Sequence, residues 1–284
     1  MTESIAVIGA GQMGNGIAHA SAQAGLPVTM IDVSAEALAK ATATIAKNLE
    51  RQVKKGILDA ATRDAALGRI ATATDLGAVA KATVVIEATT ERRDLKFKIF
   101  AEVDRLAPVG ALLATNTSSI SITEIAAQTK RPADVIGMHF MNPVPMMQLV
   151  EVIRGLATSD ATCQRTVALA TALGKTPVEA NDYPGFIANR ILMPMINEAV
   201  YCVMEGVGTP AAVDEVMKLG MNHPMGPLAL ADLIGLDTCV AILDVLHAGL
   251  GDPKYRACPL LKKYVAAGWL GRKSGRGFFT YTGG

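Results

Sequence analysis

Histidine is the side chain best suited to moving a proton near neutral pH, and this chain has four. His19 and His247 lie in apolar helical patterns, where packing is their simplest role, and His223 lies in the loop "NHPMGP". His139 ends the apolar run "VIGMHF", which is typical of a buried strand, just before the turn "MNPVPM". His139 is therefore predicted to lie at the carboxyl end of a strand, where open α/β sheets bind ligands.

A carboxylate follows His139 in the next strand-like run. Glu151 lies in "QLVEVI", and a hairpin between the two runs would bring it beside the imidazole. A carboxylate in an otherwise apolar strand needs a polar partner. A histidine held by a carboxylate has its tautomer and orientation fixed for proton transfer. The sequence thus favours a catalytic pair, with a purely structural pair as the alternative.

A glycine-rich turn near the N-terminus indicates a phosphate site. Gly9, Gly11 and Gly14 follow an apolar run and open a helical pattern, and Asp32 ends the next apolar run. This is the context of a dinucleotide fingerprint, in which the glycines permit the turn, the approach of the pyrophosphate and close helix–strand packing. Because Asp32 has no arginine beside it, the motif favours NAD over NADP: a carboxylate accepts ribose hydroxyls and repels a 2′-phosphate.

The elements that must position these residues follow from the apolar periodicity. Strand-like runs cover residues 5–9, 28–32, 84–87, 112–115 and 135–140, and alanine-rich helical stretches such as 35–55 and 96–106 separate the first four runs. Residues 147–153 and 176–180 could extend the sheet. Alternation of strands and helices predicts an α/β fold, a Rossmann-like doubly wound parallel sheet.

The pattern changes near Pro184, after which the periodicity is helical. We therefore expect an NAD-binding domain over residues 1–183 and a helical domain for substrate binding and dimerisation over residues 184–284. Apolar residues of the first helix of this second domain exceed what about 100 residues easily bury, which predicts a homodimer; they are Ile191, Met195, Ala199 and Cys202.

Composition excludes several classes of function. Half of the 284 residues are hydrophobic, so the chain can build a large core, but no apolar segment reaches the roughly 20 residues of a membrane helix. A net charge of +1 leaves no general attraction for nucleic acid. The four cysteines are widely separated, which predicts reduced thiols and neither a metal site nor a disulfide framework. With no signal peptide in view, we expect a cytoplasmic protein.

Seven segments together carry a family resemblance: "GAGQMGNGIA", "ATTERRDLKFKIF", "NTSSISI", "GMHFMNPVPMMQLVEVI", "DYPGFIANRI", "NHPMGPLALADLIGLD" and "GRKSGRGFF". They run in family order along nearly the whole chain. The sequence resembles the 3-hydroxyacyl-CoA dehydrogenases, and within them the short-chain bacterial 3-hydroxybutyryl-CoA dehydrogenases. The resemblance implies an NAD-dependent enzyme that interconverts (S)-3-hydroxybutyryl-CoA and acetoacetyl-CoA.

The resemblance also implies roles for single residues. His139 would be the catalytic acid/base and Glu151 its orienting carboxylate. Ser118 would hydrogen-bond the 3-oxygen of the substrate, and Asn189 would help to position the thioester. The alternative for Ser118 is a helix N-cap, because "SSISITEI" leads into a helical stretch, although Ser119 or Ser121 could cap it instead.

A further set of residues is expected to bind cofactor. Gln12 and Met13 complete the glycine turn, and the family places Glu91, Lys96, Asn116, Asn142 and Lys273 at the nicotinamide-ribose end. Glu91 and Lys96 have an alternative interpretation as a surface ion pair worth under about 1 kcal/mol.

Coenzyme A needs cations for its phosphates. The helix over residues 35–55 ends "NLERQVKKG", with Arg51, Lys54 and Lys55 in its last turn. These residues also suit the negative end of the helix dipole without any ligand. The family places the CoA head group against this helix, through Lys55 and Asn48.

Three other functions compete with this prediction. Dehydrogenases of the 6-phosphogluconate and 3-hydroxyisobutyrate group use a helical lysine, which "GFIANRILMPMINEA" lacks. A gulonate-type dehydrogenase similar to a lens crystallin shares the His–Glu pair but needs no CoA-facing cations. A regulatory NAD-binding protein would not need Ser118, His139, Glu151 and Asn189 together.

Overall fold

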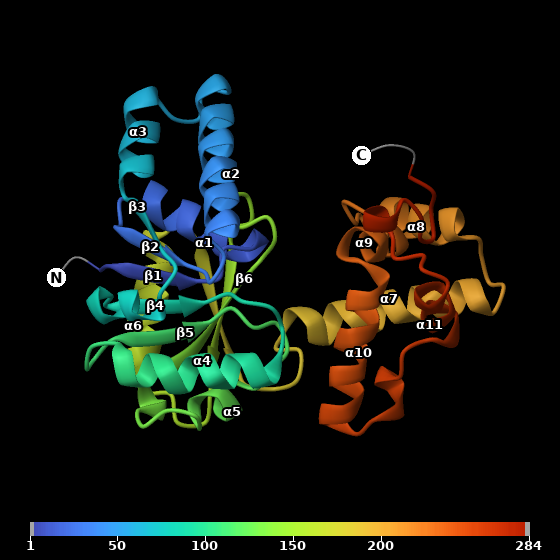
Figure 1. Cartoon of the computed structure of the whole chain (residues 1–284). Helices are drawn as coiled ribbons and strands as arrows, with labels where there is room; N and C mark the ends of the chain where they lie inside the picture. The colour runs from blue at the N-terminus through green and yellow to red at the C-terminus, as the bar shows by residue number, and fades with distance from the viewer. Residues whose placement is uncertain (1–2, 282–284) are drawn as a thin grey trace. The chain divides into compact units, whose positions relative to one another are not determined.

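Within residues 3–281, which the structure describes, the strands form one eight-stranded sheet in the order β3-β2-β1-β4-β5-β6-β7-β8. This computed structural model is drawn in Figure 1. The strands are β1 (Ile5–Ile8), β2 (Val28–Ile31), β3 (Ile70–Ala73), β4 (Val84–Glu87), β5 (Leu112–Thr115), β6 (Val135–Phe140), β7 (Leu149–Arg154) and β8 (Thr176–Asn181).

The direction of the strands creates the ligand-binding edge. Strands β1 to β6 are parallel, β7 runs antiparallel to β6, and β8 is parallel to β7. The strand order reverses between β1 and β4, so the carboxyl ends of these two strands flank a topological switch point, where doubly wound sheets bind their ligands. The predicted fold class is confirmed.

One edge of the sheet differs from the sequence prediction. The structure adds α3 (Ala60–Gly68) and β3, which the apolar pattern did not indicate. The sequence "IATA" of β3 is only half-buried, because it forms the last strand at an open edge. A short edge strand with no fully buried residue lacks the long apolar run by which the central strands are recognised.

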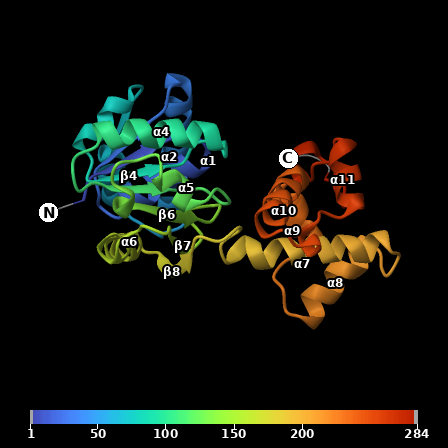
Figure 2. The same cartoon turned by 90° about the horizontal axis from the view of Figure 1, so that it is seen from below.

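Helices cover both faces of the sheet. They are α1 (Gln12–Gln23), α2 (Ala35–Lys54), α3, α4 (Arg93–Leu106), α5 (Ile122–Ala126) and α6 (Asp160–Ala172), with short 3₁₀ turns η1 (Leu76–Lys81) and η2 (Pro132–Asp134). Helices α1, α2 and α6 share one core with the strands, whereas α4 and α5 lie on the opposite face (Figure 1). Figure 2 shows α6 beside β7 and β8.

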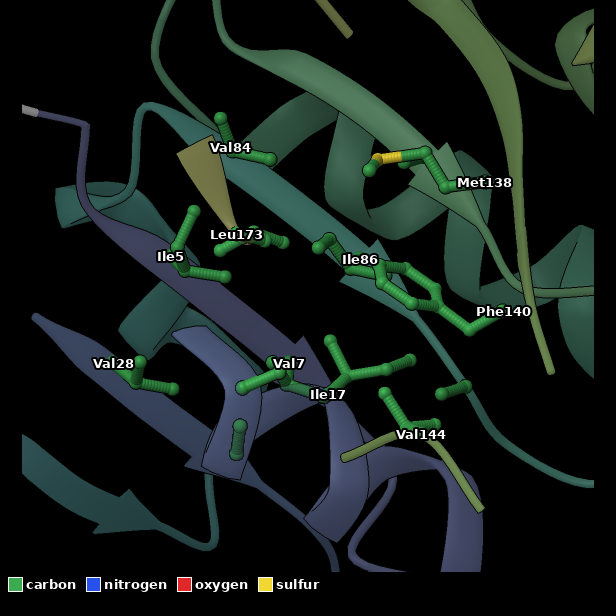
Figure 3. Packing of buried hydrophobic residues seen from close by; sticks show 14 of the residues in the cluster. Ile5, Val7, Ile17, Val28, Val84, Ile86, Met138, Phe140, Val144 and Leu173 are labelled. Carbon is green, nitrogen blue, oxygen red and sulfur yellow. The ribbon is translucent and has the colours of Figure 1, made fainter. Parts of the chain in front are cut away.

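Alternate strand residues build the core under α1, α2 and α6. Ile5 and Val7 of β1 and Val84 and Ile86 of β4 point to the same side, as the period of two in a strand requires. Ile17 of α1 packs into the same cluster (Figure 3). Because this core fixes β1 against β4, it also fixes the switch point at their ends.

The chain divides between Tyr183 and Pro184 into two compact units, and the second is helical. Its helices are α7 (Ala188–Met204), α8 (Pro210–Gly220), α9 (Pro227–Ile234), α10 (Leu236–Leu250) and α11 (Pro259–Ala266), with 3₁₀ turns η3 (Pro253–Tyr255) and η4 (Arg272–Ser274). Helix α7 packs against α8, α9, α10 and α11 (Figure 2). Among residues 3–281, no helix is both long enough and apolar enough to cross a membrane.

The apolar face proposed for dimerisation is only partly exposed. Ile191 is 66% exposed, but Ala199 is buried in the core of the helical unit, and Met195 and Cys202 are half-buried. Much of that face therefore packs within its own unit.

Truncation of Ile86 should destabilise the first unit strongly. Its side chain is fully buried in β4, so Ile86→Ala removes buried methylenes and leaves a cavity, at a cost of about 2–5 kcal/mol in unfolding free energy. Urea unfolding followed by circular dichroism measures this loss. Val109→Ala, at a fully exposed position, is the control and should stay within about 0.5 kcal/mol of wild type. Equal stability of the two variants would contradict this account of the core.

Candidate active site

In the turn from β1 into α1, the surrounding backbone requires glycine at positions 9 and 14 but not at position 11. Gly9 has a φ of +103°, and a Cβ there would lie 2.7 Å from the carbonyl oxygen of Ala88, while a Cβ on Gly14 would overlap the carbonyl oxygen of Gly9. Gly11 has a φ of −67° and open space around it, so no described protein atom demands a glycine there. Close approach of a ligand to the backbone is the remaining reason for this residue.

The start of α1 is suited to an anion. This helix begins at Gln12 with neither a capping side chain nor an acidic residue in its first turn, whereas Ser34 caps α2 and Asp59 caps α3. Its first backbone N–H groups and the positive end of its dipole therefore face the turn without a competing carboxylate. Met13 is half-buried against the core. The residues present fit a pyrophosphate at this turn.

Asp32 lies directly after β2 with its carboxylate fixed by the backbone. Oδ2 accepts a hydrogen bond from the N–H of Ala10 at 2.8 Å, and Oδ1 accepts one from the N–H of Ser34 at 2.9 Å. Each carboxylate oxygen can accept a second hydrogen bond. The group can thus receive ribose hydroxyls beside the glycine turn.

The antiparallel register of β6 and β7 pairs His139 with Glu151 directly across the ladder. The imidazole Nδ1 lies 2.7 Å from Oε2 of Glu151, and the two side chains are 10% and 2% exposed. This contact gives the buried carboxylate its polar partner and orients Nε2 of the ring away from it. The hairpin that the sequence analysis invoked is present.

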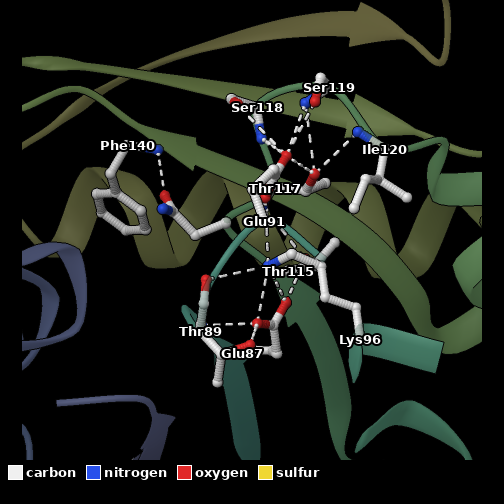
Figure 4. A network of polar contacts seen from close by, with 11 residues as sticks. Glu87, Thr89, Glu91, Lys96, Thr115, Thr117, Ser118, Ser119, Ile120 and Phe140 are labelled. Atoms are coloured by element: carbon white, nitrogen blue, oxygen red, sulfur yellow. Dashed lines mark hydrogen bonds and ion pairs between the residues drawn. The ribbon is translucent and has the colours of Figure 1, made fainter. Parts of the chain in front are cut away.

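Glu91 fastens the segment that carries Ser118 (Figure 4). Its Oε1 accepts hydrogen bonds from the N–H groups of Ser118 at 2.9 Å and Ser119 at 3.1 Å, and from the hydroxyl of Thr117. Burial alone would raise the pKa of Glu91, but the nearby Lys96 ammonium and these hydrogen bonds outweigh it and hold the pKa below its ordinary value. Glu91 is thus a stable anion. The N-cap of α5 is Ser121, one of the two alternatives to Ser118.

Lys96 is a buried residue, so its interpretation as part of a surface ion pair is wrong. Its side chain is 1% exposed, and Nζ lies 2.8 Å from both carboxylate oxygens of Glu87 and 3.5 Å from Oε2 of Glu91. Removal of one partner from such a pair typically costs about 3–5 kcal/mol.

Glu87 is the site residue that the sequence analysis missed. It ends β4 with no exposure, and it also accepts a hydrogen bond from the Thr115 hydroxyl at 2.7 Å. The available signal was an acidic residue closing the apolar run "VVIE", the same signal that singled out Glu151.

Asparagines connect the ends of neighbouring strands. The Asn116 side-chain oxygen accepts a hydrogen bond from the N–H of Phe140 at 2.8 Å, next to His139. Gln12 donates to the side-chain oxygen of Asn142 at 3.0 Å, which joins the glycine turn to the loop after β6. The predicted cofactor residues of the first unit therefore gather at the carboxyl edge of the sheet.

The residues predicted to bind the CoA phosphates lie at the C-terminal end of α2. Arg51 and Lys55 are exposed, Asn48 is half-buried, and Lys54 lies 3.8 Å from Glu50 in an exposed ion pair. Lys55 is the residue at which the helix ends.

Two predicted site residues belong to the helical unit. Asn189 is buried near the start of α7, and Lys273 forms an ion pair with Asp237 at 2.6 Å. Their contacts with substrate or cofactor stay predictions. Within the described part of the chain, no cluster of histidine, cysteine, aspartate or glutamate is arranged to hold a metal ion.

Comparison with known proteins identifies the family. Residues 4–183 match the family model of the 3-hydroxyacyl-CoA dehydrogenase NAD binding domain, and residues 185–281 match that of the C-terminal domain.

Individual relatives match this chain along nearly their whole length. A Bacillus subtilis protein named probable 3-hydroxybutyryl-CoA dehydrogenase is 58% identical, covering 98% of this chain and 97% of its own. The Bradyrhizobium diazoefficiens 3-hydroxybutyryl-CoA dehydrogenase is 55% identical, covering 99% and 96%. The crystal structure of (S)-3-hydroxybutyryl-CoA dehydrogenase from Ralstonia eutropha is 50% identical and superposes with a TM-score of 0.97 over all of both chains.

The predictions of a dehydrogenase and of NAD as its cofactor are confirmed by these matches. An open glycine turn and an uncapped helix at the switch point, with a fixed aspartate at the end of the neighbouring strand β2, are what an NAD-binding domain requires. The chain belongs to the 3-hydroxyacyl-CoA dehydrogenase family.

Proposed function

We propose that this enzyme interconverts (S)-3-hydroxybutyryl-CoA and acetoacetyl-CoA, with His139 and Glu151 as its acid/base pair. The observation that carries the proposal is the 2.7 Å contact between Nδ1 of His139 and the buried carboxylate of Glu151 at the ligand-binding edge of the sheet. The names of the bacterial relatives support this choice of substrate.

His139 moves the proton of the substrate hydroxyl. Nδ1 donates its hydrogen to Glu151, so Nε2 is the nitrogen that accepts the hydroxyl proton during oxidation and returns it during reduction. Glu151 holds the ring and stabilises the imidazolium that forms. When bound, NAD would supply the acceptor for the hydride that leaves C3 of the substrate. Both transfers require their atoms within about 3.5 Å of each other.

Ser118 polarises the 3-oxygen. A hydroxyl that hydrogen-bonds this oxygen stabilises the charge that develops on it in the transition state. The backbone N–H of Ser118 donates to Glu91 at 2.9 Å and holds the residue in place. Its hydroxyl also donates to Glu91, at 3.3 Å, and turns from that carboxylate to the 3-oxygen when the substrate binds. Asn189 is assigned to the thioester end of the substrate.

The cofactor and CoA ends use separate groups. Glu91, Asn116 and Asn142 are assigned to the nicotinamide ribose. Lys96 is buried and acts on this edge through its ion pair with Glu91. Lys273, in the helical unit, is assigned to the same end of the cofactor. The exposed cations Arg51, Lys54 and Lys55, together with Asn48, are assigned to the CoA phosphates. A homodimer formed through the helical unit and a cytoplasmic location are further proposals.

The activity itself is tested by loss of NADH absorbance with acetoacetyl-CoA. Turnover with this thioester, and no gain of NADH absorbance when a free sugar acid such as gulonate is supplied with NAD, supports the proposal. Turnover of gulonate but not of the thioester would contradict it, and NADH binding without turnover of either would indicate a regulatory protein.

His139 and Glu151 should behave as one catalytic unit. His139→Ala should lower kcat by about 10²–10⁴-fold, the usual contribution of general acid–base catalysis. Because both residues serve one proton transfer, the His139→Ala/Glu151→Gln double variant should be little worse than His139→Ala alone. Steady-state kinetics on variants with wild-type circular dichroism spectra measure this. Losses that multiply would show that the two residues act independently.

Asp32 should set the cofactor preference. Wild type should favour NAD over NADP by at least about 100-fold in kcat/KM, since contact between like charges costs several kcal/mol. Asp32→Asn keeps the shape of the side chain but removes its charge, and should narrow this ratio. Comparable wild-type rates with both cofactors would refute the role of Asp32.

Lys55 should act on substrate binding. If its ammonium holds a CoA phosphate, Lys55→Ala should raise KM for acetoacetyl-CoA more than it lowers kcat, the pattern of an interaction lost equally from ground and transition states. A truncated thioester without the nucleotide should be indifferent to the change. Lys40→Ala, an exposed lysine near the other end of α2, is the matched control. Equal harm to both thioesters would mean a structural effect.

A further inference from the structure

We propose that Asp182 is a positioning residue for Ser118: it holds residues 121–123, at the end of the segment that Glu91 does not bind. This inference rests on the proposed role of Ser118 at the substrate 3-oxygen. Asp182 follows β8, the last strand of the first unit, and no role has so far been given to it.

Asp182 anchors the start of α5 through three hydrogen bonds. Oδ2 accepts from the Ser121 hydroxyl at 2.7 Å and from the N–H of Thr123 at 2.8 Å, and Oδ1 accepts from the N–H of Ile122 at 3.0 Å. These bonds satisfy backbone donors that a helix start leaves without intrahelical partners. Because α5 has only five residues, its own hydrogen bonds contribute little, and this external carboxylate adds to the Ser121 cap in holding its start.

The anchor is itself mounted on the sheet. The N–H of Asp182 donates to the carbonyl oxygen of Arg154 at 3.0 Å, which continues the pairing of β8 with β7. Strand β7 also carries Glu151. Asp182 therefore links the start of α5 to β7, the strand that carries Glu151.

Ser118 lies in the part of the segment that Glu91 holds, three residues before the first residue that Asp182 binds. Glu91 binds residues 117–119, Asp182 binds residues 121–123, and the N–H of Ile120 donates to the Thr117 hydroxyl at 2.9 Å between them (Figure 4 shows the Glu91 side). Two carboxylates thus fix both ends of one short segment. Glu91 holds residues 117–119 through several hydrogen bonds, one of them from the Ser118 hydroxyl at 3.3 Å, and Asp182 restrains the other end of the segment at residues 121–123.

The size of the effect follows from the demands of the chemistry. A misplacement of about 1 Å in a catalytic group can cost on the order of 10²-fold in rate. Asp182→Ala should therefore lower kcat by about 10–100-fold while KM for acetoacetyl-CoA and the Kd for NADH change less than about 2-fold. Asp182→Asn retains one acceptor oxygen and should lose less.

The test is a double-variant cycle with Ser118→Ala, read by kcat, by KM and by NADH fluorescence titration. If Asp182 acts through Ser118, the Ser118→Ala/Asp182→Ala double variant should match Ser118→Ala alone. Ser159→Ala is the matched control: it removes the N-cap of α6, another helix of this unit, and should leave kcat unchanged. Should Asp182→Ala not fold, Asp182→Asn takes its place in the same cycle.

The outcomes separate this inference from the proposed function. If Ser118→Ala lowers kcat but the Asp182 variants do not, or if their losses multiply, the inference is overturned and the role of Ser118 stands. If Ser118→Ala keeps wild-type kcat, the role of Ser118 and the inference both fall, while the assignment of His139 is untouched. If Ser159→Ala lowers kcat as much as Asp182→Ala does, the loss in Asp182→Ala comes from reduced helix stability. This result would also overturn the inference.

Discussion

Burial of carboxylates at the carboxyl edge of the sheet is the constraint on which the site depends. A carboxylate removed from water is costly unless charged or hydrogen-bonding partners surround it. Glu151 meets this demand with His139, and Glu87 meets it with Lys96. In each case the partner must come from a neighbouring element, so the demand for a partner also fixes the geometry between elements.

The same requirement organises the loops that follow the strands. Glu91 gathers the backbone of residues 117–119, Asp32 gathers the N–H groups of Ala10 and Ser34, and Asp182 gathers the start of α5. Carboxylates thus hold these irregular segments in place, as backbone hydrogen bonds between neighbouring strands hold a sheet. The consequence for the reaction is that polar groups are held in place before any ligand arrives, which is the condition for electrostatic stabilisation of a transition state.

Much of this arrangement was open to prediction from local pattern. The central strands are continuous apolar runs because they are covered on both faces, and the motif around Gly9, Gly11 and Gly14 identified its turn because steric demands act within a few residues. Prediction failed at β3, which is half-exposed at the edge, and at Lys96, whose burial depends on Glu87 in another element.

By itself, the sequence determined the α/β class of the first unit, the nucleotide turn and the choice of His139 and Glu151 as partners. These follow from periodicity, from backbone sterics and from the cost of an acidic residue in an apolar strand, all of which are local. Only the tertiary structure decided that Lys96 pairs with Glu87 inside the protein and that Asp182 binds the start of a helix about sixty residues earlier in the chain. Such contacts join residues far apart in sequence, because strand order and register, rather than spacing along the chain, bring them within hydrogen-bonding distance.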